Sequence, residues 1–553
     1  MKTLLIFFFC FFLYASSFAK PRENVSLSPY SVIKTQVSSN GNNVATWIWN
    51  TGVFNQDLRT NNTAGFEWPK GSGKFAIFTS GLSMAAFVNG GLRLASVSYN
   101  GEYAPGYVLN GVFTTNSAFK LYRVNRGDNA NTNPDYANWG LMIPYGAPYD
   151  DINNNGVFDP ATDKPGIKNS AQTIFVCLTD ADASNHTTSE GFSGGTLPLF
   201  SEMHFTSWSY DNVLGLEDVQ FLKMEIVNKN SSSWTRAQFG IVADPDLGDA
   251  SDDYVGSDIG RNLGYCYNSD NNDGDGNVRT YGANPPAVGV DMLKGAVNRS
   301  VTPNADLYMT SFISFVGTGS GGIICETDPS AAPIASFNYL KGTKRDSTPF
   351  INPQTMLRTK FCFSGDPETA SGWTEFTGKI NNCGGDTTGS VVASTPGDKR
   401  FVMGSGADNL TIVPGEKQTF LIAQLIARGS NNKNSVTKLK QLSDAVQAFY
   451  NSNLSVGIST LSTCVPDKLN LYQNYPNPFN PTTRIKFDID KSGFASLIVY
   501  NVAGKEITRL VNQNLNSGSY EFEFNAADLP SGVYFYKLET PNATSVKKMS
   551  LIK

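Results

Sequence analysis

The sequence predicts a mainly β protein, with one or two β-sandwich-like body domains followed by a small β domain. Turn-forming Asn, Gly, Ser and Thr take the place of the usual Lys and Glu, and only 16% of the residues are charged. Phe and Tyr, which favour strands, are plentiful. The chain has 553 residues, which exceeds the roughly 250–300 that one hydrophobic core organises, so we expect two or three domains.

Short apolar runs separated by glycine turns mark the expected strands of the body. Asn89-Gly90-Gly91 and Asn100-Gly101 are typical of hairpins, because these residues adopt a positive φ at little cost. The pattern leaves open whether the body is one domain or is divided near residue 200. Strands are expected over residues 74–82, 84–100, 106–113, 119–124, 173–180, 219–229, 307–317, 356–365 and 418–429.

One packing helix is expected near the end of the body. Ser435 is placed to cap its N-terminus. Apolar residues then recur at three- and four-residue spacing, which is one face of a helix: Val436, Leu439, Leu442, Val446 and Phe449.

The composition changes near Cys464, where the body is expected to end. From Leu469 onward, short strands alternate with clear turns at the spacing of a small sandwich. We therefore assign residues 20–465 to the body and residues 466–553 to a C-terminal domain.

The first 19 residues have the pattern of a signal peptide. Lys2 supplies a positive charge, residues 4–14 are apolar, and small residues follow up to Ala19. This apolar run is too short to span a membrane, and no other stretch approaches 18 apolar residues. We expect residues 1–19 to be removed and the rest to be exported without a transmembrane segment.

Charge and cysteine spacing exclude several classes of function. The net charge is −5 and no basic patch stands out, so nucleic acid and anionic membranes are not expected partners. The absence of a C-x-x-C pair disfavours a zinc ribbon or a redox centre. Beyond the signal peptide, an even number of cysteines permits three disulfides in 15 connectivities, although some could be free buried thiols: Cys177, Cys266, Cys325, Cys362, Cys383 and Cys464.

A candidate calcium loop begins at Asp151. Its oxygen ligands would be Asp151, Asn153, Asn155, the carbonyl of Val157, and Asp159. Gly156 at the sixth position would let the loop turn sharply around the ion. The loop resembles those of dockerin and thrombospondin-type repeats, but Thr162 stands at position 12, so Asp163 would close the shell. The alternative is a turn that holds no ion.

Two further acidic tracts are less regular. Asp270, Asp273 and Asp275 form a second candidate calcium loop in poorer register. Upstream, residues 244–253 contribute five more carboxylates, which either bind a cation or form a solvated loop.

Catalytic motifs are weak throughout. Gly191-Phe-Ser193-Gly-Gly195 matches the G-x-S-x-G pattern, but a polar loop precedes it and Pro198 follows. Gly317-Thr-Gly319-Ser-Gly-Gly322 matches G-x-G-x-x-G, but no helix follows that could hold phosphate. A pair of glycosidase carboxylates carries no local signature, so the catalytic residues of any hydrolase stay unknown.

The C-terminal segment carries several ordered motifs. They are the proline-rich run Tyr475, Pro476, Asn477, Pro478 to Pro481, the turn ending at Gly504, the segment Leu529–Tyr534 with Gly532, and a last strand containing Lys548 and Lys553. Over its full length this segment resembles the type A C-terminal sorting domain of type IX secretion. The resemblance implies an Ig-like seven-stranded sandwich recognised by the outer-membrane secretion machinery. It also implies removal after export, often with attachment of the body to surface lipopolysaccharide.

Several body stretches resemble uncharacterised secreted surface proteins with this sorting domain, a group that implies no mechanism. We expect a secreted or cell-surface protein whose structural or adhesive body is stabilised by calcium, with glycans as possible further partners. The alternative is a secreted hydrolase of polysaccharide or protein. A carboxylate groove lined with Trp and Tyr would favour the hydrolase.

Overall fold

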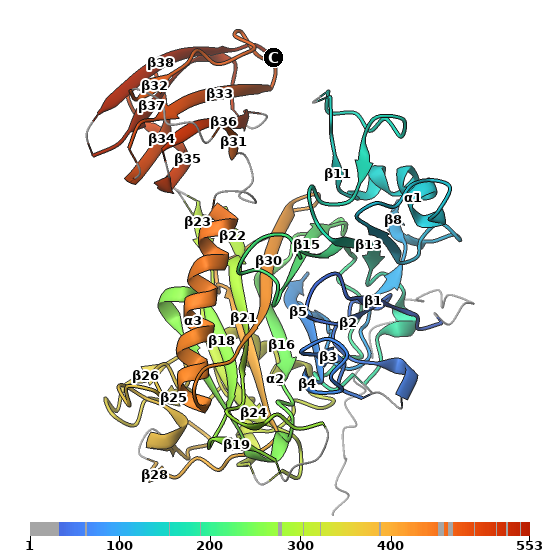
Figure 1. Ribbon diagram of the computed structural model, residues 1–553, viewed down its shortest axis with the longest axis vertical. Helices are drawn as coiled ribbons and strands as arrows, with labels where there is room; N and C mark the ends of the chain where they lie inside the picture. Colours follow the sequence, from blue (N-terminus) through green and yellow to red (C-terminus); the bar gives the residue numbers. More distant parts are fainter. Residues whose placement is uncertain are drawn as a thin grey trace, which may run out of the picture.

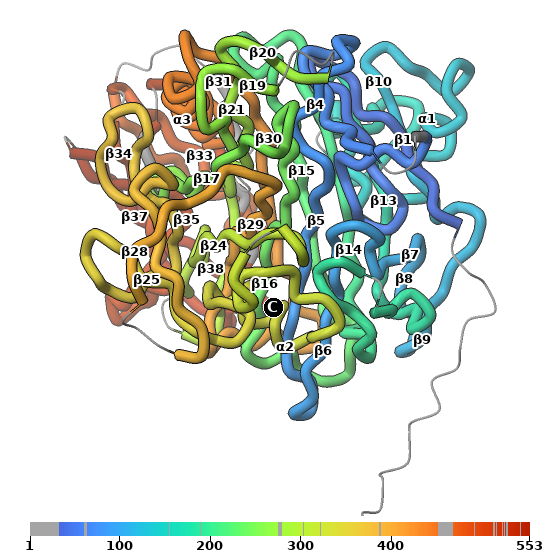
Figure 2. The backbone as a smooth tube through the Cα atoms, turned by 90° about the horizontal axis from the view of Figure 1, so that it is seen from below, coloured from blue at the N-terminus to red at the C-terminus, as the bar shows by residue number. Residues whose placement is uncertain are grey.

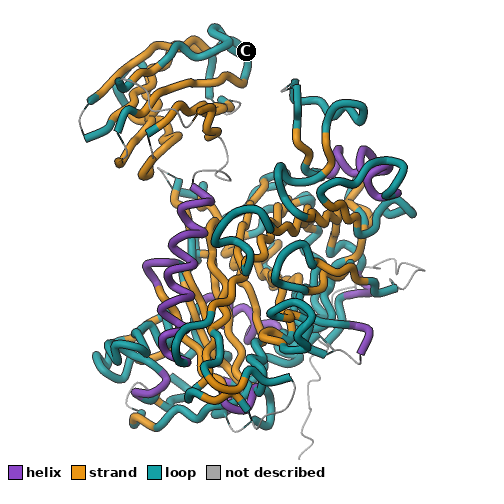
Figure 3. Tube along the Cα trace, in the orientation of Figure 1, coloured by secondary structure: helices purple, strands orange, loops and turns teal. Residues whose placement is uncertain are grey.

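The computed structural model describes residues 33–553 except 61–62, 154, 189, 275–278, 302–303, 321, 386–388, 452–457, 463–467, 492, 516, 527–528 and 542. The predicted signal peptide, Asp275, Cys464 and the assigned boundary at 465/466 lie outside the described residues. The described chain is mostly strands with few helices, which confirms the predicted fold class (Figures 1 and 3).

The body is built around two antiparallel sheets (Figure 1). The nine-stranded sheet has the order β10 (Tyr122–Asn125), β13 (Gln172–Thr179), β14 (Ser201–Ser209), β15 (Val219–Asn228), β30 (Lys417–Ala427), β21 (Ala287–Lys294), β18 (Leu263–Asn268) and β17 (Asp253–Asp258), with β7 (Ala104–Pro105) also pairing with β13. The five-stranded sheet has the order β24 (Ser311–Val316), β29 (Lys399–Gly406), β16 (Thr235–Asp244), β5 (Thr79–Val88) and β6 (Gly91–Ala95), seen from below in Figure 2.

The main core lies between these two sheets. Phe239 of β16 meets Phe420 of β30 with ring centroids 4.8 Å apart. One cluster of buried side chains runs from Val44 to Ile426, so it includes residues from both sheets. The position near residue 200 falls between β13 and β14, which pair along their whole length within one sheet.

A helix covers the outer face of the nine-stranded sheet. Leu421 of β30 points to this face, where it joins Val436 and Leu439 of α3 (Asn432–Phe449) in a second cluster. The expected helix is present, but the predicted N-cap residue is wrong. Asn431 is the N-cap and accepts a hydrogen bond from the Asn434 N–H, whereas Ser435 lies inside the first turns.

A second helix covers the five-stranded sheet. In α2 (Pro333–Lys341), Leu340 packs over two strand glycines that leave space for it. A Cβ on Gly240 would lie 2.7 Å from Leu340 Cδ2, and a Cβ on Gly404 would lie 2.5 Å from the Leu340 carbonyl oxygen. Close helix–sheet contact therefore explains both glycines.

The remaining body strands form two-stranded ribbons on the loops that connect the sheets (Figure 3). The ribbons are β1 (Gln36–Ser39) with β2 (Thr46–Trp49), β3 (Phe66–Glu67) with β4 (Phe75–Ile77), β8 (Tyr107–Leu109) with β9 (Val112–Thr114), β11 (Tyr149–Asp150) with β12 (Lys164–Pro165), β19 (Asn272–Asp273) with β20 (Gly282–Ala283), β22 (Ala296–Asn298) with β23 (Ala305–Leu307), β25 (Phe350–Ile351) with β26 (Arg358–Thr359), and β27 (Lys379–Ile380) with β28 (Val391–Val392). The short helix α1 spans Pro134–Asn138.

One hairpin turn predicted from the sequence is confirmed, whereas a second predicted hairpin and one predicted strand are not formed. Asn89 (φ 50°) and Gly90 (φ 81°) form the hairpin turn between β5 and β6, as predicted. Gly101 also has a positive φ, but no strand pair meets across it. The strand expected over residues 356–365 is wrong, since only Arg358–Thr359 is a strand there.

The C-terminal domain is a sandwich of two four-stranded sheets. One has the order β31 (Ile458–Ser462), β36 (Gly518–Asn525), β33 (Thr482–Ile489) and β32 (Asn470–Leu471). The other has the order β35 (Glu506–Leu515), β34 (Gly493–Asn501), β37 (Gly532–Glu539) and β38 (Thr544–Leu551). Their inward side chains form a separate hydrophobic cluster. The sandwich thus has eight strands, of which seven, β32 to β38, lie within residues 466–553 and one, β31, comes from the residues before that assigned boundary.

Candidate functional site

The proline-rich segment Tyr475–Pro481 holds the last strand of the C-terminal domain. Asn477 Oδ1 accepts a hydrogen bond from the Ser550 N–H (2.9 Å). The Phe479 N–H donates to the Ser550 carbonyl, and the Phe479 carbonyl accepts from the Ile552 N–H, each at 3.0 Å. The segment is therefore a clasp on β38, in addition to the stiff lead-in that its prolines predict.

The clasp has a buried and an exposed part. The Phe479 side chain lies inside the domain core, whereas the Tyr475 side chain is 82% exposed. Thr483 Oγ1 donates to the carbonyl of Pro476 (2.8 Å), which ties the segment to β33. The peptide bonds before Pro476 and Pro478 are cis. The exposed tyrosine is available for recognition, and the buried phenylalanine is structural.

The other motif residues divide in the same way. Gly504 has φ 76° in the turn between β34 and β35, as a glycine turn requires. The buried Tyr534 donates its hydroxyl hydrogen to the Pro530 carbonyl (2.8 Å). Gly532 begins β37 and does not have a positive φ.

Leu529 packs partly buried against the domain core. Lys548 and Lys553 are exposed. On β38, Met549 and Leu551 face inward, and alternation along the strand turns Lys548 outward.

The Asp151 loop is closed at its base by the pairing of β11 with β12. Asp151 accepts hydrogen bonds from the N–H groups of Asn155 (3.2 Å) and Gly156 (2.7 Å). Asn153 Oδ1 accepts from the Asn155 N–H, and Asn155 Oδ1 accepts from the Val157 N–H. Gly156 has φ 75° with no atom within 4 Å of an added Cβ, so only its backbone conformation demands glycine.

Asp163 closes the loop from the other end. Its side chain is buried, and its two oxygens accept from the Ile152 N–H (2.9 Å) and the Asp159 N–H (2.8 Å). Asp159 in turn accepts from the Ala161 N–H. The oxygens of this loop are therefore turned toward its own backbone donors, and a cation would have to compete with those donors for them.

The second acidic loop does not gather its carboxylates in the same way. Asp273 is fully buried and accepts hydrogen bonds from the N–H groups of Asp249 and Tyr281. Burial raises its pKa to about 6. Asp270 is exposed and accepts from the Asn272 N–H (2.8 Å). Asp273 thus holds the surrounding turns together through these hydrogen bonds.

The G-x-S-x-G segment is a buried turn. Ser193 has φ 67°, its side chain is fully buried, and no helix follows it. His186 Nε2 lies 2.7 Å from the Asp180 carbonyl oxygen, and His186 Nδ1 lies 3.5 Å from a Glu102 oxygen. Burial lowers the pKa of His186 and raises that of Glu102 to about 9. This constellation is a buried polar network inside the fold.

Three carboxylates meet where β16 ends and β29 begins. One oxygen each from Asp244, Asp246 and Asp398 lies within 4.8 Å of the others. They line a cavity of about 440 Å³ together with Tyr99 and Arg400. Burial, reinforced by Asp398, raises the pKa of Asp244 to about 7. The sequence shows the acidic tract at residue 244 but not its meeting with Asp398, because only the folded sheet brings β29 beside β16.

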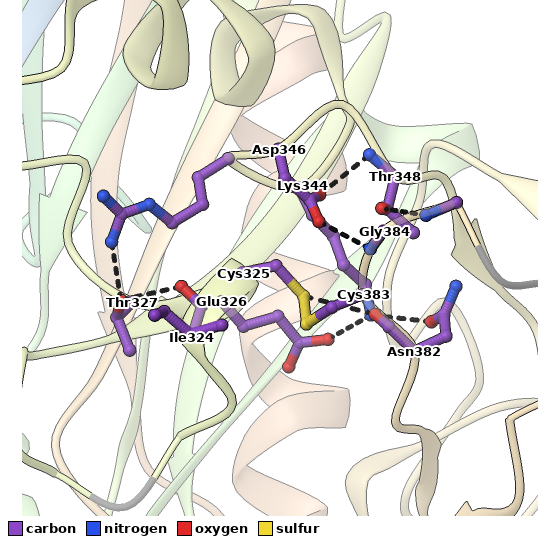
Figure 4. The surroundings of a disulfide bond; sticks show 12 residues. Ile324, Cys325, Glu326, Thr327, Lys344, Asp346, Thr348, Asn382, Cys383 and Gly384 are labelled. Atoms are coloured by element: carbon purple, nitrogen blue, oxygen red, sulfur yellow. Dashed lines mark hydrogen bonds and ion pairs between the residues drawn. A yellow bond between two sulfur atoms is a disulfide. The ribbon is translucent and has the colours of Figure 1, made fainter.

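The described cysteines form one disulfide, Cys325–Cys383, while Cys177, Cys266 and Cys362 are buried free thiols. Beside the disulfide, Lys344 Nζ donates to the carbonyl and the side-chain oxygen of Asn382 and pairs with Glu326 at 2.6 Å (Figure 4). The disulfide therefore ties together two loop segments that lie far apart in the sequence.

Comparison with known proteins identifies the C-terminal domain. Residues 473–553 match the family model described as "Secretion system C-terminal sorting domain". Among curated proteins, none matches the chain. Within the described residues, we find no helix with the length and apolar character needed to cross a membrane.

Proposed function

We propose, from the premise that this chain is a type IX secretion substrate with a type A sorting domain, that its body is a structural and adhesive module stabilised by calcium. The premise makes the protein secreted or displayed at the cell surface and makes the secretion machinery its partner. Attachment to surface lipopolysaccharide or to glycans belongs to the proposal.

The observation that carries the calcium part is the Asp151 loop. Oxygen side chains stand at its first, third, fifth and ninth positions, and the sixth-position Gly156 has the left-handed conformation that such a loop needs. Extracellular modules bind calcium at roughly 10⁻⁴–10⁻³ M, so this loop needs only modest affinity. The ion would replace backbone donors at Asp151 and Asp159 and would cross-link a loop closed only by two-residue strands.

The test is thermal unfolding of the wild type and of Asp151→Asn, each with millimolar calcium and with chelator. Calcium at a hundredfold its dissociation constant stabilises the native state by about 2.7 kcal/mol. We expect chelator to lower the melting temperature of the wild type and to lower that of Asp151→Asn by a smaller amount. An unchanged wild-type melting temperature would mean that the loop is a turn that binds no calcium.

A matched pair of glycine variants separates backbone strain from ion binding. Gly156 and Gly215 both have a positive φ and no atom within 4 Å of an added Cβ. Either residue replaced by valine should cost about 1–2 kcal/mol through the left-handed backbone. Only Gly156→Val should also reduce the response to calcium, by the same amount as Asp151→Asn does.

A secreted hydrolase is the second candidate, and the carboxylate cavity favours it. Asp244, with a pKa of about 7, would suit a general acid, and Asp398 is the neighbouring carboxyl group. The aromatic residues lining the cavity are Phe78 and Tyr99, and tryptophan is absent from that lining. Hydrolysis of polysaccharide or protein substrates that is abolished by Asp244→Asn would support this function over the adhesive one.

The sorting domain is proposed to be removed after export, between Val465 and Leu469. Mass spectrometry of the extracellular protein should find a start near Lys20 and an end in that interval. An intact C-terminus on the extracellular protein would contradict the processing step.

A further inference from the structure

The carboxylate cavity joins three separate segments of the body. Asp244 ends β16, Asp246 follows it by two residues, and Asp398 directly precedes β29. Asp328, from the loop after β24, lies near the same cavity because it forms an ion pair with Arg400. Four carboxylates therefore surround one guanidinium, and the local charge balance is strongly negative.

Arg400 pairs with only part of this charge. Its Nε lies 3.2 Å from Asp244 Oδ2, its Nη1 lies 3.4 Å from Asp328 Oδ1, and its Nη2 lies 3.3 Å from Asp398 Oδ2. Tyr99 also donates its hydroxyl hydrogen to Asp244 Oδ2 (2.5 Å). All of these bonds to Asp244 and Asp398 use the Oδ2 atoms.

The opposite oxygens have no such partners. Among the described residues, Asp244 Oδ1 and Asp398 Oδ1 are buried atoms without a hydrogen-bond partner. The Asp244 side chain lines the cavity although the residue is only 5% exposed. A buried oxygen that lacks a partner costs about 1–3 kcal/mol, and more when it carries charge. An additional positive group at this place would remove that cost.

The donor set defines the chemistry of that group. The three converging ligands are carboxylate oxygens, which hard divalent cations prefer. Both histidines of the chain are engaged elsewhere, with Asp180 and with Glu202, so the site lacks the nitrogen donors typical of zinc. Ligands of one calcium ion at roughly 2.4 Å lie at most about 4.8 Å apart, and these three oxygens lie within 4.8 Å of one another.

The cavity also gives an ion access and water. Its volume of about 440 Å³ leaves room for water ligands beside three carboxylates. The Asp398 side chain is 38% exposed, so the cavity reaches solvent. Calcium tolerates a mixed shell of protein oxygens and water.

We propose that Asp244, Asp246 and Asp398 form a calcium site, separate from the Asp151 loop, that fastens the end of β16 to the start of β29. Arg400 is the fixed counter-charge of this site, and calcium supplies the remaining positive charge. The competing arrangement places a proton on Asp244 or Asp246.

The experiment is calorimetric titration of the purified full chain with calcium chloride near pH 7. The variants are Asp398→Asn for the cluster, Asp151→Asn for the loop, and Asp211→Asn as a matched control. Asp211 forms a two-bond ion pair with Arg126 on the surface, so its variant also removes an arginine partner. Circular dichroism confirms the fold of each variant.

We expect Asp151→Asn to retain millimolar calcium binding. Asp398→Asn should weaken that binding at least tenfold, and Asp211→Asn should behave as the wild type. If Asp398→Asn does not fold, calcium binding by Asp151→Asn alone decides whether a second site exists. Absence of millimolar calcium binding in Asp151→Asn, or an unchanged isotherm in folded Asp398→Asn, would overturn the proposal. If Asp151→Asn binds calcium as the wild type does while Asp398→Asn binds it more weakly, the result contradicts the Asp151 loop site alone.

Discussion

Replacement of Phe479 by alanine should strongly destabilise the sorting domain while leaving its exposed side chains unchanged. The Phe479 side chain is 2% exposed and packs against Phe524, with ring centroids 6.2 Å apart. Truncating a buried phenylalanine costs about 3–5 kcal/mol. A small domain has roughly 5–15 kcal/mol of stability, so this loss removes a large part of it.

Tyr475→Ala is the matched control from the same segment. Its side chain is 82% exposed, and its two hydrogen bonds with Arg484 run through the backbone, which alanine keeps. Surface substitutions of this kind change stability by about 0.5 kcal/mol or less. Any loss of export in Tyr475→Ala would therefore report on recognition, whereas loss in Phe479→Ala reports on folding.

The assay combines urea unfolding of the sorting domain with fractionation of the producing cells. Phe479→Ala should lower the unfolding midpoint strongly and leave the protein in the periplasm. Tyr475→Ala should keep the wild-type midpoint. An unchanged midpoint for Phe479→Ala, or an equal loss in both variants, would refute the division between buried and exposed parts of the clasp.

Three further predictions concern pH, the disulfide and the last strand. Burial raises the pKa of Asp291 to about 8, although Ser443 donates a hydrogen bond to it, so the folded state binds the proton more tightly and stability falls as pH rises from 3.8 to about 8. Asp291→Asn should flatten this fall of up to about 1.4 kcal/mol per pH unit, and parallel melting profiles of the two proteins would count against it. Replacing Cys325 and Cys383, separated by 58 residues, with alanine should cost about 4 kcal/mol by the chain-entropy relation, and an unshifted denaturation midpoint would contradict that origin. Deleting the chain from Val546 onward removes most of β38 and should trap the protein in the periplasm, so normal surface delivery of the truncation would disprove the dependence.

Local chemistry made several elements predictable. The Asn89-Gly90 hairpin follows from two residues that tolerate a positive φ, and the helix over residues 432–449 follows from its apolar face. The position of its cap was not predictable from the same rules, since Asn431 and Ser435 offer the same kind of acceptor. Tertiary contacts decide between them: the Asn432 side chain donates to the Asn268 carbonyl (2.8 Å) and fixes where the helix starts.

The missed features depend on contacts between distant segments. The apolar run over residues 356–365 lies across the end of β24, where the Cys362 N–H donates to the Phe312 carbonyl, and it does not extend as a strand. The carboxylate cavity needs β16 and β29 to be neighbours in the five-stranded sheet. Sequence spacing holds no information on that neighbourhood, so Asp398 and Arg400 carried no signal of their own.

The strand β31 precedes the interval where we propose that the sorting domain is cut, yet it pairs with β36 of that domain. Cleavage there would divide a single sheet between the two products. The released domain would expose a row of unsatisfied N–H and C=O groups along β36, and such an edge accepts any strand of suitable register. The tail left on the body would be one such strand, so the severed products could re-anneal until dilution or a competing strand separates them.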